Sequence, residues 1–398
     1  MKVLIVVDNT FVNDIRVTKE VRILMSEHEV HVLCLQFDHR ESQHFDSGVT
    51  LHPVIIRRKL KDFLYLIMNT WSIYEWFWTR LISKSIQELN PDVIHVHDLY
   101  MSKATRKAID SAKSKAKMVL DLHENYPEAI KSYNWTKGWW RSVLSKPNRW
   151  FEKEKSYLEM ADELVVLSDD FKKTLVDRYA ELKEKNNITV FPNVIDITQF
   201  AAFEIDTTVE KRSGVTLLYF GGIAERRGIF ESMDAVAEIA RKGYELTLLM
   251  IGPVDNSDKV RFDQRMQSND LRNIAEHIEW IDIKQLPSYM HISDICLAPF
   301  HKNPQHESGV ANKLFQYMFG AKPIVASDCK PQKDLIESAG CGIIFSNQTE
   351  YVHALKKLID NSALRAEMGE KGRLELMEKY ANPDYEKVLT NLYRNFEN

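Results

Sequence analysis

The stretch Glu307–Asp328 reads ESGVANKLFQYMFGAKPIVASD. A glycine-containing turn leads into an expected helix at about 311–319, which Gly320 and Pro323 end, and the apolar run 324–326 predicts a buried strand. A loop that feeds a helix N-terminus suits an anion, because the first amides lack intrahelical partners and the helix dipole favours negative charge. The stretch therefore predicts an α/β unit with a candidate anion site. A capped helix before a buried strand is also a common structural pattern without a ligand.

Two amides on this helix suggest a more specific ligand. Asn312 and Gln316 lie four residues apart, so they share one helix face. Side-chain amides both donate and accept hydrogen bonds, as a sugar or ribose hydroxyl requires.

Length and composition indicate a globular protein of two domains. The chain has 398 residues, of which 44% are apolar and 28% charged, and its net charge of −4 gives no global sign of nucleic-acid binding. The four cysteines show no metal-ligand spacing, which predicts buried free thiols rather than a zinc site or disulfides. Residues 2–7 already form a strand-like run, so we expect no signal peptide and a cytoplasmic protein.

Short apolar runs alternate with amphipathic ones along the whole chain, which predicts parallel sheets covered by helices. We expect an N-terminal Rossmann-like domain at 1–200, a second at 201–375 and a C-terminal helical segment at 376–398 that returns to the first domain. The polar stretch 206–213 reads as the linker. Strands are expected near 2–7, 29–35, 92–96, 118–122, 163–167 and 188–191, and then near 216–220, 246–251, 277–280, 294–298, 323–327 and 342–345.

A glycine pair and two arginines form a second candidate anion site. Gly222 ends the pair that follows an expected strand, and Arg226 and Arg227 come next, before a helix. Glycine lets a ligand approach the backbone, and arginines grip a diphosphate by charge-assisted hydrogen bonds. The alternative is a solvated charge run beside Glu225 and Glu231.

Several motifs, in this order and spacing, resemble family 4 retaining glycosyltransferases. They are DVIHVHD (92–98), LDLHENYPE (120–128), ADELVVLS (161–168), FPNVID (191–196), FGGIAERRG (220–228), LPSYMHISDICLAPF (286–300) and ANKLFQYMFGAKPIVAS (311–327). The last is similar to the family's PNKLFEYMAxGKPVVAS. The resemblance implies the GT-B fold: two Rossmann-like doubly wound parallel-sheet domains that face each other across a cleft. The first would bind an acceptor and the second a nucleotide-sugar donor.

The resemblance also implies a donor site. Gln316 stands where the family places the ribose-binding Glu of its E-x7-E pair, and Ser308 stands at the first Glu, one step after Glu307. Arg227 takes the position of a family Lys, and Gly222 that of a family Arg. The implied donor-binding set is Gly222, Arg226, Arg227, Ser308, Gly309, Val310, Ala311, Asn312, Lys313 and Gln316, with Glu307 reaching the sugar as a catalytic candidate.

The first domain offers residues for the acceptor and the transferred sugar. His123 ends an expected strand, and the family's histidine at this place faces the donor sugar, which makes it a catalytic candidate. His97, Glu124, Asp14 and Arg16 are candidates on the acceptor or sugar side. A strand-end histidine is otherwise often structural, and Asp14 also suits a helix N-cap, a role compatible with the first. Metal-ligand spacing and a D-x-D pair are both missing, so we expect no metal and no other cofactor.

Tryptophans gather with basic residues in the first domain. They are Trp71, Trp76, Trp78, Trp135, Trp139, Trp140 and Trp150, following or interleaved with Arg57, Arg58, Lys59, Lys61, Lys131, Lys137, Arg141, Lys146 and Arg149. Such a mixture suits the interface of an anionic membrane, where the protein would lie peripherally at the inner face of the plasma membrane. The alternative is tryptophans packed in the domain core. Nothing here resembles a nucleic-acid recognition motif.

We expect a retaining glycosyltransferase that moves a sugar from a nucleoside-diphosphate sugar to a glycan or lipid-linked acceptor in cell-surface polysaccharide synthesis. In the family the leaving phosphate itself is thought to help deprotonate the acceptor, so no protein base is named. Two alternatives remain at this point: a nucleotide-sugar epimerase of the same fold, and a catalytically weak partner subunit of a transferase complex.

Overall fold

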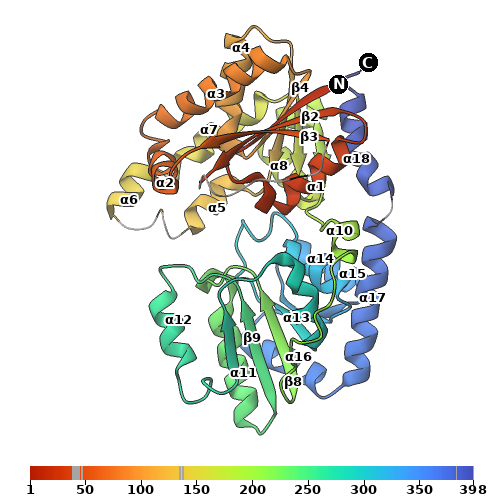
Figure 1. Cartoon of the computed structure of the whole chain (residues 1–398). Coiled ribbons are helices and arrows are strands. Elements are labelled where there is room, and N and C mark those ends of the chain that lie inside the picture. Colours follow the sequence, from red (N-terminus) through yellow and green to blue (C-terminus); the bar gives the residue numbers. More distant parts are fainter. Residues whose placement is uncertain (38–44, 46–47, 134–135, 137–138, 382, 398) are drawn as a thin grey trace. The chain divides into compact units, whose positions relative to one another are not determined.

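The computed structural model describes residues 1–37, 45, 48–133, 136, 139–381 and 383–397 (Figure 1). The chain divides into two compact units, Met1–Pro192 with Asp384–Asn398, and Asn193–Pro383. The division therefore falls at Pro192, before the expected boundary at 200, and the stretch 206–213 that we expected as the linker belongs to the second unit. The last helix contributes its residues from Asp384 onward to the first unit.

The first unit is built on a seven-stranded parallel sheet of order β3-β2-β1-β4-β5-β6-β7. Its strands are β1 (Lys2–Val7), β2 (Glu29–Gln36), β3 (Val49–Ile55), β4 (Val93–His97), β5 (Lys117–Leu122), β6 (Glu163–Val166) and β7 (Ile188–Val190). Its helices are α1 (Ile15–Leu24), α2 (Arg58–Ile67), α3 (Ile73–Leu89), α4 (Ser102–Ser111), α5 (Tyr126–Ser132), α6 (Trp139–Ser145), α7 (Arg149–Glu159), α8 (Asp169–Arg178), α9 (Ala180–Lys185) and α18 (Pro383–Arg394).

Helices bury both faces of this sheet. Along β1, Leu4 and Val6 join one hydrophobic core, while Val3, Ile5 and Val7 join the other, which is the two-residue period of a strand. The second core is completed by α1 and by Leu389, Leu392 and Tyr393 of α18, which lies beside α1 in Figure 1. The end of the chain is therefore part of the first unit's core.

Strand β3 is the one element of this sheet that the sequence patterns do not predict. Its residues read VTLHPVI, in which His52 and Pro53 interrupt the apolar pattern, and it is only partly buried. It lies at the sheet edge, the position at which a sheet tolerates proline.

The second unit contains a six-stranded parallel sheet of order β10-β9-β8-β11-β12-β13. Its strands are β8 (Val215–Phe220), β9 (Leu246–Ile251), β10 (Ala275–Ile278), β11 (Ile295–Ala298), β12 (Ile324–Ser327) and β13 (Gly342–Phe345). Its helices are α10 (Ile197–Ala201), α11 (Ile229–Arg241), α12 (Lys259–Met266), α13 (Leu286–Ile292), α14 (Asn312–Phe319), α15 (Lys330–Ala339), α16 (Gln348–Ile359) and α17 (Ser362–Tyr380). Strand β10 begins two residues before the expected one.

Strand order locates the candidate sites within each unit. In the first sheet, β2 and β3 add to one side of β1, and β4 then starts the other side. In the second sheet, β9 and β10 add to one side of β8, and β11 starts the other. Ligands of open α/β sheets bind beyond the carboxyl ends of the strands at such switch points. The segments there are those after β1 and β4 in the first unit, and after β8 and β11 in the second.

All four cysteines are buried and free, as the sequence predicts. Among the described residues, the helices are all too short or too polar to cross a membrane.

Gly228, at the start of α11, should be hard to replace. Its φ of +71° is left-handed, and an added Cβ would lie 1.7 Å from the Pro299 carbonyl oxygen. Gly243 has a φ of +90° but open space around it, so it is a matched control. We expect Gly228→Ala to lower the free energy of unfolding by about 1–3 kcal/mol more than Gly243→Ala, the usual cost of forced overpacking. Urea denaturation measures both, and equal losses would contradict the close contact.

Candidate functional site

In the second unit, the loop after β8 brings a glycine pair against two cations. Gly221 has a φ of +116°, and a Cβ added to it would lie 3.3 Å from the amine nitrogen of Lys313. A Cβ on Gly222 would lie 3.8 Å from the guanidinium of Arg227. The Tyr219 hydroxyl donates to the Gly222 carbonyl at 2.7 Å and fixes the loop. The glycines thus leave room for an arginine and a lysine beside the backbone.

Lys313 is a buried amine whose nitrogen has no hydrogen-bond partner within the described protein. It lies 3.7 Å from the centre of the Tyr219 ring and 5.0 Å from that of Phe300. Burial lowers the pKa of Lys313 well below its usual range, and Arg227 lowers it further. A buried cation without a counter-charge is unstable, so this position favours an anionic partner.

Helix α14 presents its first amides without a side-chain cap. Its N-cap is Ala311, which offers no oxygen to them. The unpaired amides and the helix dipole together favour negative charge here. The hydroxyl of Tyr317, on the same helix, accepts a hydrogen bond from the Phe220 amide at 2.9 Å. This bond ties α14 to the end of β8, so the helix and the glycine loop are held together.

The amides that we expected to reach hydroxyl groups are mostly occupied or enclosed. Asn312 donates from Nδ2 to the Asn193 carbonyl at 3.0 Å and so ties α14 to the segment before α10. Gln316 is only 2% exposed. In this structure Asn312 therefore has a structural hydrogen bond, and little of Gln316 is open to a ligand.

The carboxylate and hydroxyl before α14 are likewise in local contacts. Ser308 is buried and donates to the Gln305 carbonyl at 2.7 Å. Glu307 is partly exposed, 3.7 Å from the Lys302 amine. Gly309, Val310 and Ala311 are half-buried between them and the helix. Their donor-binding roles stay predictions.

His306 is a residue that the sequence patterns do not single out. Its Nδ1 donates to the His301 carbonyl at 2.8 Å, so Nε2 is the ring nitrogen left as an acceptor. Burial, with a contribution from the positive charges of Arg227 and Arg226, lowers the pKa of His306 to about 4. A neutral histidine near two arginines can accept a hydrogen bond where they provide positive charge. It lies outside any motif, and only the fold reveals it.

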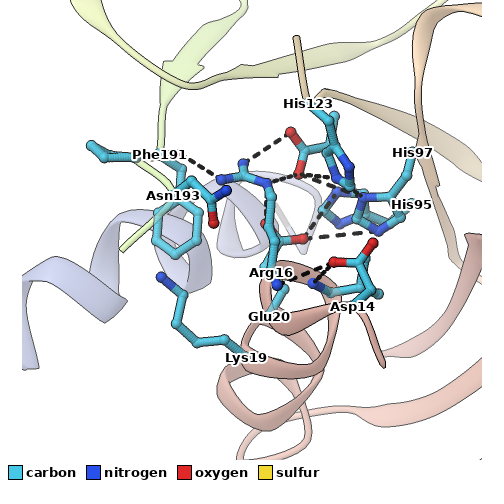
Figure 2. A network of polar contacts seen from close by, with 12 residues as sticks. Asp14, Arg16, Lys19, Glu20, His95, His97, His123, Phe191 and Asn193 are labelled. Carbon is cyan, nitrogen blue, oxygen red and sulfur yellow. Dashed lines mark hydrogen bonds and ion pairs between the residues drawn. The ribbon is translucent and has the colours of Figure 1, made fainter. Parts of the chain in front are cut away.

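In the first unit, Arg16 lies at the centre of a buried network (Figure 2). Its Nε and Nη2 donate to the two oxygens of Asp121 at 2.8 and 2.9 Å, and its Nη1 donates to the Phe191 carbonyl at 2.9 Å. Arg16 is 3% exposed and Asp121 is fully buried. The guanidinium is thus committed inside the unit, which fits a supporting role better than the substrate contact we expected.

Glu20 and two histidines of β4 form the rest of this network. The Oε2 atom of Glu20 is 3.9 Å from the Nε2 atoms of His95 and His97, and these atoms have no hydrogen-bond partner within the described protein. The Nδ1 atom of His95 is bonded to the Tyr393 hydroxyl of α18 at 2.7 Å. Burial, with the neighbouring Asp121, raises the pKa of Glu20 well above its usual range, whereas Arg16 holds that of Asp121 well below its own despite burial.

These side chains are of the types that bind metals, and one ligand atom from each of Glu20, His95, His97 and Asp121 lies within 4.8 Å of the others. Two observations count against a tetrahedral zinc among them. Two ligands of a tetrahedral zinc lie about 3.4 Å apart, since each bond is about 2.1 Å long. The Glu20–histidine distances of 3.9 Å exceed this. Nε of Arg16 lies 3.0 Å from Glu20 Oε1, which would put a guanidinium beside the ion. We therefore assign the group to proton and charge balance.

His123 is the member of the network that reaches the surface, with a side chain 21% exposed. Its Nε2 is 2.8 Å from His97 Nδ1 and 3.7 Å from Asp121 Oδ2. Asp14 caps α1 by accepting from the Arg16 and Val17 amides, so the N-cap interpretation of Asp14 is confirmed.

The remaining first-unit candidates differ in their accessibility. His97 is 1% exposed, whereas Glu124 is half-buried and accepts a hydrogen bond from the Tyr133 hydroxyl. His97 is therefore too buried to meet a ligand and instead bonds His123, whereas Glu124 is still partly accessible.

The raised pKa of Glu20 predicts a pH-dependent stability. A group protonated in the fold contributes stability below its ordinary pKa and loses it as the pH rises toward the folded pKa. Glu20→Gln cannot ionise, so its free energy of unfolding should gain on the wild type as the pH rises from about 4.5, by up to about 1.4 kcal/mol per pH unit. Urea denaturation across this range, with the exposed Glu184→Gln as control, measures the slope. A difference between Glu20→Gln and wild type that does not change with pH would contradict the assignment.

Comparisons with known proteins agree with this architecture. A model described as Glycosyltransferase Family 4 matches residues 21–199, and one described as Glycosyl transferases group 1 matches 203–375. Relatives include the capsular polysaccharide biosynthesis glycosyltransferase CapM of Staphylococcus aureus, 23% identical over 61% of this chain and 64% of its own length. Alpha-D-kanosaminyltransferase of Streptomyces kanamyceticus is 24% identical over 45% of each chain. The matches thus span less than two thirds of these relatives.

Solved structures resemble the chain over nearly its whole length. Sucrose-phosphate synthase of Thermosynechococcus elongatus has a TM-score of 0.77 at 13% identity, covering 99% of this chain and 98% of its own. Alr3699/HepE of Anabaena, in complex with UDP, has a TM-score of 0.67 at 12% identity and full coverage of both. A trehalose-6-phosphate synthase, studied for glycosyl transfer with retention, has a TM-score of 0.73 at 12% identity and covers 98% and 99%. The two family models account for most of both units, and the chain belongs to the family 4 and group 1 glycosyltransferases, enzymes of the GT-B fold.

Proposed function

We propose that this glycosyltransferase acts with retention, moving a sugar from a nucleoside-diphosphate sugar to a glycan or lipid-linked acceptor during synthesis of a cell-surface polysaccharide. The observation that carries the proposal is the buried, unpartnered amine of Lys313 beside Arg227 and the glycine loop. A diphosphate supplies the anion that this position favours and also accepts hydrogen bonds from arginine.

The donor-side residues have distinct roles in this proposal. Arg227, Lys313 and the first amides of α14 would hold the diphosphate. They would also stabilise the charge that develops on it as the sugar leaves, the main contribution expected of fixed donors in such a site. Arg226 lies beside Arg227 in the same turn and adds positive charge. His306, neutral and near both arginines, would accept a hydrogen bond from the donor.

The second unit would bind the donor and the first the acceptor. In the second unit, cations and free amides gather at the ends of β8 and β11. In the first, the segments after β4 and β5 carry carboxylates and histidines, such as Asp98 and His123, which suit sugar hydroxyls. UDP in the Anabaena neighbour supports a nucleoside diphosphate, the retention studied in the trehalose-6-phosphate synthase supports the stereochemistry, and CapM supports a polysaccharide product.

Exposed apolar side chains of the first unit support a lipid-linked acceptor. Trp139 of α6 is 84% exposed, and Leu60, Phe63, Trp71, Ile73, Trp76 and Val143 are exposed as well. Exposed Arg57, Arg58, Lys59 and Arg141 lie among them in the sequence. We call these residues the apolar-basic surface. Anionic lipid matches both its charge and its apolar character.

Hydrogen bonds join two of the helices that carry this surface, α2 and α6. The amide of Asn69 donates to the Ser145 carbonyl at 2.8 Å, and the hydroxyl of Thr70 donates to the Leu144 carbonyl at 2.7 Å. These bonds tie the end of α2 to the end of α6. Trp78 and Trp150 are buried in the core instead, Trp135 lies outside the described residues, and the side chain of Trp140 is not described. Two of the tryptophans are thus core residues, whereas Trp71, Trp76 and Trp139 are exposed, as a membrane contact would require.

Arg227→Ala tests the donor site. Loss of a charge-assisted contact typically costs about 1.5–3 kcal/mol, so nucleoside-diphosphate affinity should fall roughly ten- to hundredfold with little change in melting temperature. The control is Arg261→Ala, since Arg261 is an exposed arginine of the same unit that pairs with Glu225. Calorimetry with a panel of nucleoside diphosphates measures both variants. Unchanged affinity in Arg227→Ala would remove Arg227 from the site, and epimer formation from a nucleotide-sugar without acceptor would contradict the transferase proposal.

Trp139→Ser tests the apolar-basic surface. The wild type should co-sediment with vesicles of anionic phospholipid at low salt and release them as salt rises, because exposed charges are screened over about 10 Å at 0.1 M. Trp139→Ser should bind less. Trp280, 74% exposed in the second unit, provides the matched control Trp280→Ser, which should bind like the wild type. Absence of co-sedimentation at low salt, or equal loss in both variants, would contradict a membrane role for this surface.

A further inference from the structure

Asp121 occupies an unusual place in the first unit. It is fully buried near the carboxyl end of β5, and both of its oxygens accept from Arg16, which comes from α1. Two histidine nitrogens lie at nearly equal distances from its Oδ2, His97 Nδ1 at 3.6 Å and His123 Nε2 at 3.7 Å. One carboxylate, fixed in direction by a guanidinium, thus faces a pair of imidazoles.

The two imidazoles share one hydrogen bond. His97 Nδ1 and His123 Nε2 are 2.8 Å apart, so a proton lies between them. His97 is buried, whereas His123 is partly exposed. Because Nε2 of His123 points into the network, Nδ1 is the ring nitrogen through which this residue can meet a ligand.

We propose that Asp121 is a positioning residue, which holds the His123 imidazole in one orientation and in its positively charged form. The inference rests on the proposed function, in which His123 lies on the sugar-binding side. Arg16 fixes the carboxylate, His97 completes the contact, and the Nδ1–H of the partly exposed His123 becomes a charged hydrogen-bond donor. Such a donor suits an oxygen of the sugar or of the leaving phosphate.

The charges around His123 favour this form. Burial would lower its pKa, but the contact with Asp121, with help from Asp98 and Asp14, outweighs burial and raises the pKa of His123 to about 10. The other titratable groups around His123 are the cation Arg16 and the buried side chains His95, His97 and Glu20. Arg16 is already paired with Asp121. Burial lowers the pKa values of both His95 and His97 and raises that of Glu20, so it disfavours the charged form of all three side chains. The nearby positive charge is therefore concentrated on Arg16 and His123.

The decisive measurement is the titration of His123 in the full-length protein. Two-dimensional 15N–1H spectra of histidine-labelled protein report protonation and tautomer, and His123→Asn assigns the signal. We expect His123 to remain protonated well above pH 6.5, the ordinary value for histidine. In Asp121→Asn, which keeps the shape and removes the charge, the midpoint should fall by at least one pH unit, a tenfold change in proton affinity. An ordinary midpoint in the wild type overturns the proposal even if Asp121→Asn does not fold.

His95→Asn is the matched control, because His95 has similar burial and lies in the same network but bonds Tyr393 rather than His123. It should leave the His123 midpoint within a few tenths of a pH unit. Transferase kinetics add a second readout: kcat/KM of Asp121→Asn should fall most at alkaline pH, where His123 would lose its proton. A loss of equal size at every pH indicates a merely structural role and overturns the proposal.

The titration requires neither donor nor acceptor, so it separates this inference from the proposed function. A high midpoint that falls in Asp121→Asn supports the inference even if Arg227→Ala leaves nucleotide affinity unchanged, a result that would count against the proposed donor site alone. Elemental analysis of the purified protein completes the test. Stoichiometric metal that is lost in His95→Asn would overturn the assignment of the network to charge balance.

Discussion

The Arg16 guanidinium is the contact on which the first unit's candidate site depends. It joins α1, β5 and the carbonyl of Phe191 through three hydrogen bonds in a fully buried setting. Removing one partner of a buried ion pair leaves an uncompensated charge and typically costs about 3–5 kcal/mol. Arg16 lies in the first turn of α1, so the start of this helix fixes the orientation of the Asp121 carboxylate. That carboxylate in turn faces the His123 imidazole. Asp14, which caps that helix, is part of the same constraint.

Glu20 is the second carboxylate beside Arg16, and its burial limits the negative charge of this network. Two carboxylates close to one guanidinium cannot both ionise at low energy in a buried place. Asp121 receives two hydrogen bonds from Arg16, which holds its pKa well below the usual range, while burial and the neighbouring Asp121 raise the pKa of Glu20 well above its own. The second unit has the opposite imbalance, with Arg227 near a buried lysine that lacks a counter-ion. Each unit thus has a distinct electrostatic character, although their sheets are similar.

Much of the fold could be predicted because its strands are continuous apolar runs and its motifs lie at strand ends. Strand β3 could not, since a partly exposed edge strand with His52 and Pro53 has no clear apolar period. The motifs also located His123, Arg227 and Lys313, but their spacing says nothing about burial. Only the fold shows that Arg16 is enclosed by Asp121 and that Asn312 bonds the Asn193 carbonyl. The family resemblance implied contact roles at these positions, and packing decides which side chains remain accessible.

His306 and Glu20 illustrate the same limit for residues that sequence reasoning did not select. Each acquires a perturbed pKa from neighbours that are distant in sequence or from burial, and neither belongs to a motif. Gln316 is a further residue whose setting only the fold shows. It lies three residues after Lys313 on α14, so the two side chains are neighbours on the helix surface. The family's glutamate at this position would add a carboxylate to the helix, whereas the amide of Gln316 adds no charge of its own. Because Gln316 is only 2% exposed, its packing and not the motif decides which groups it can reach.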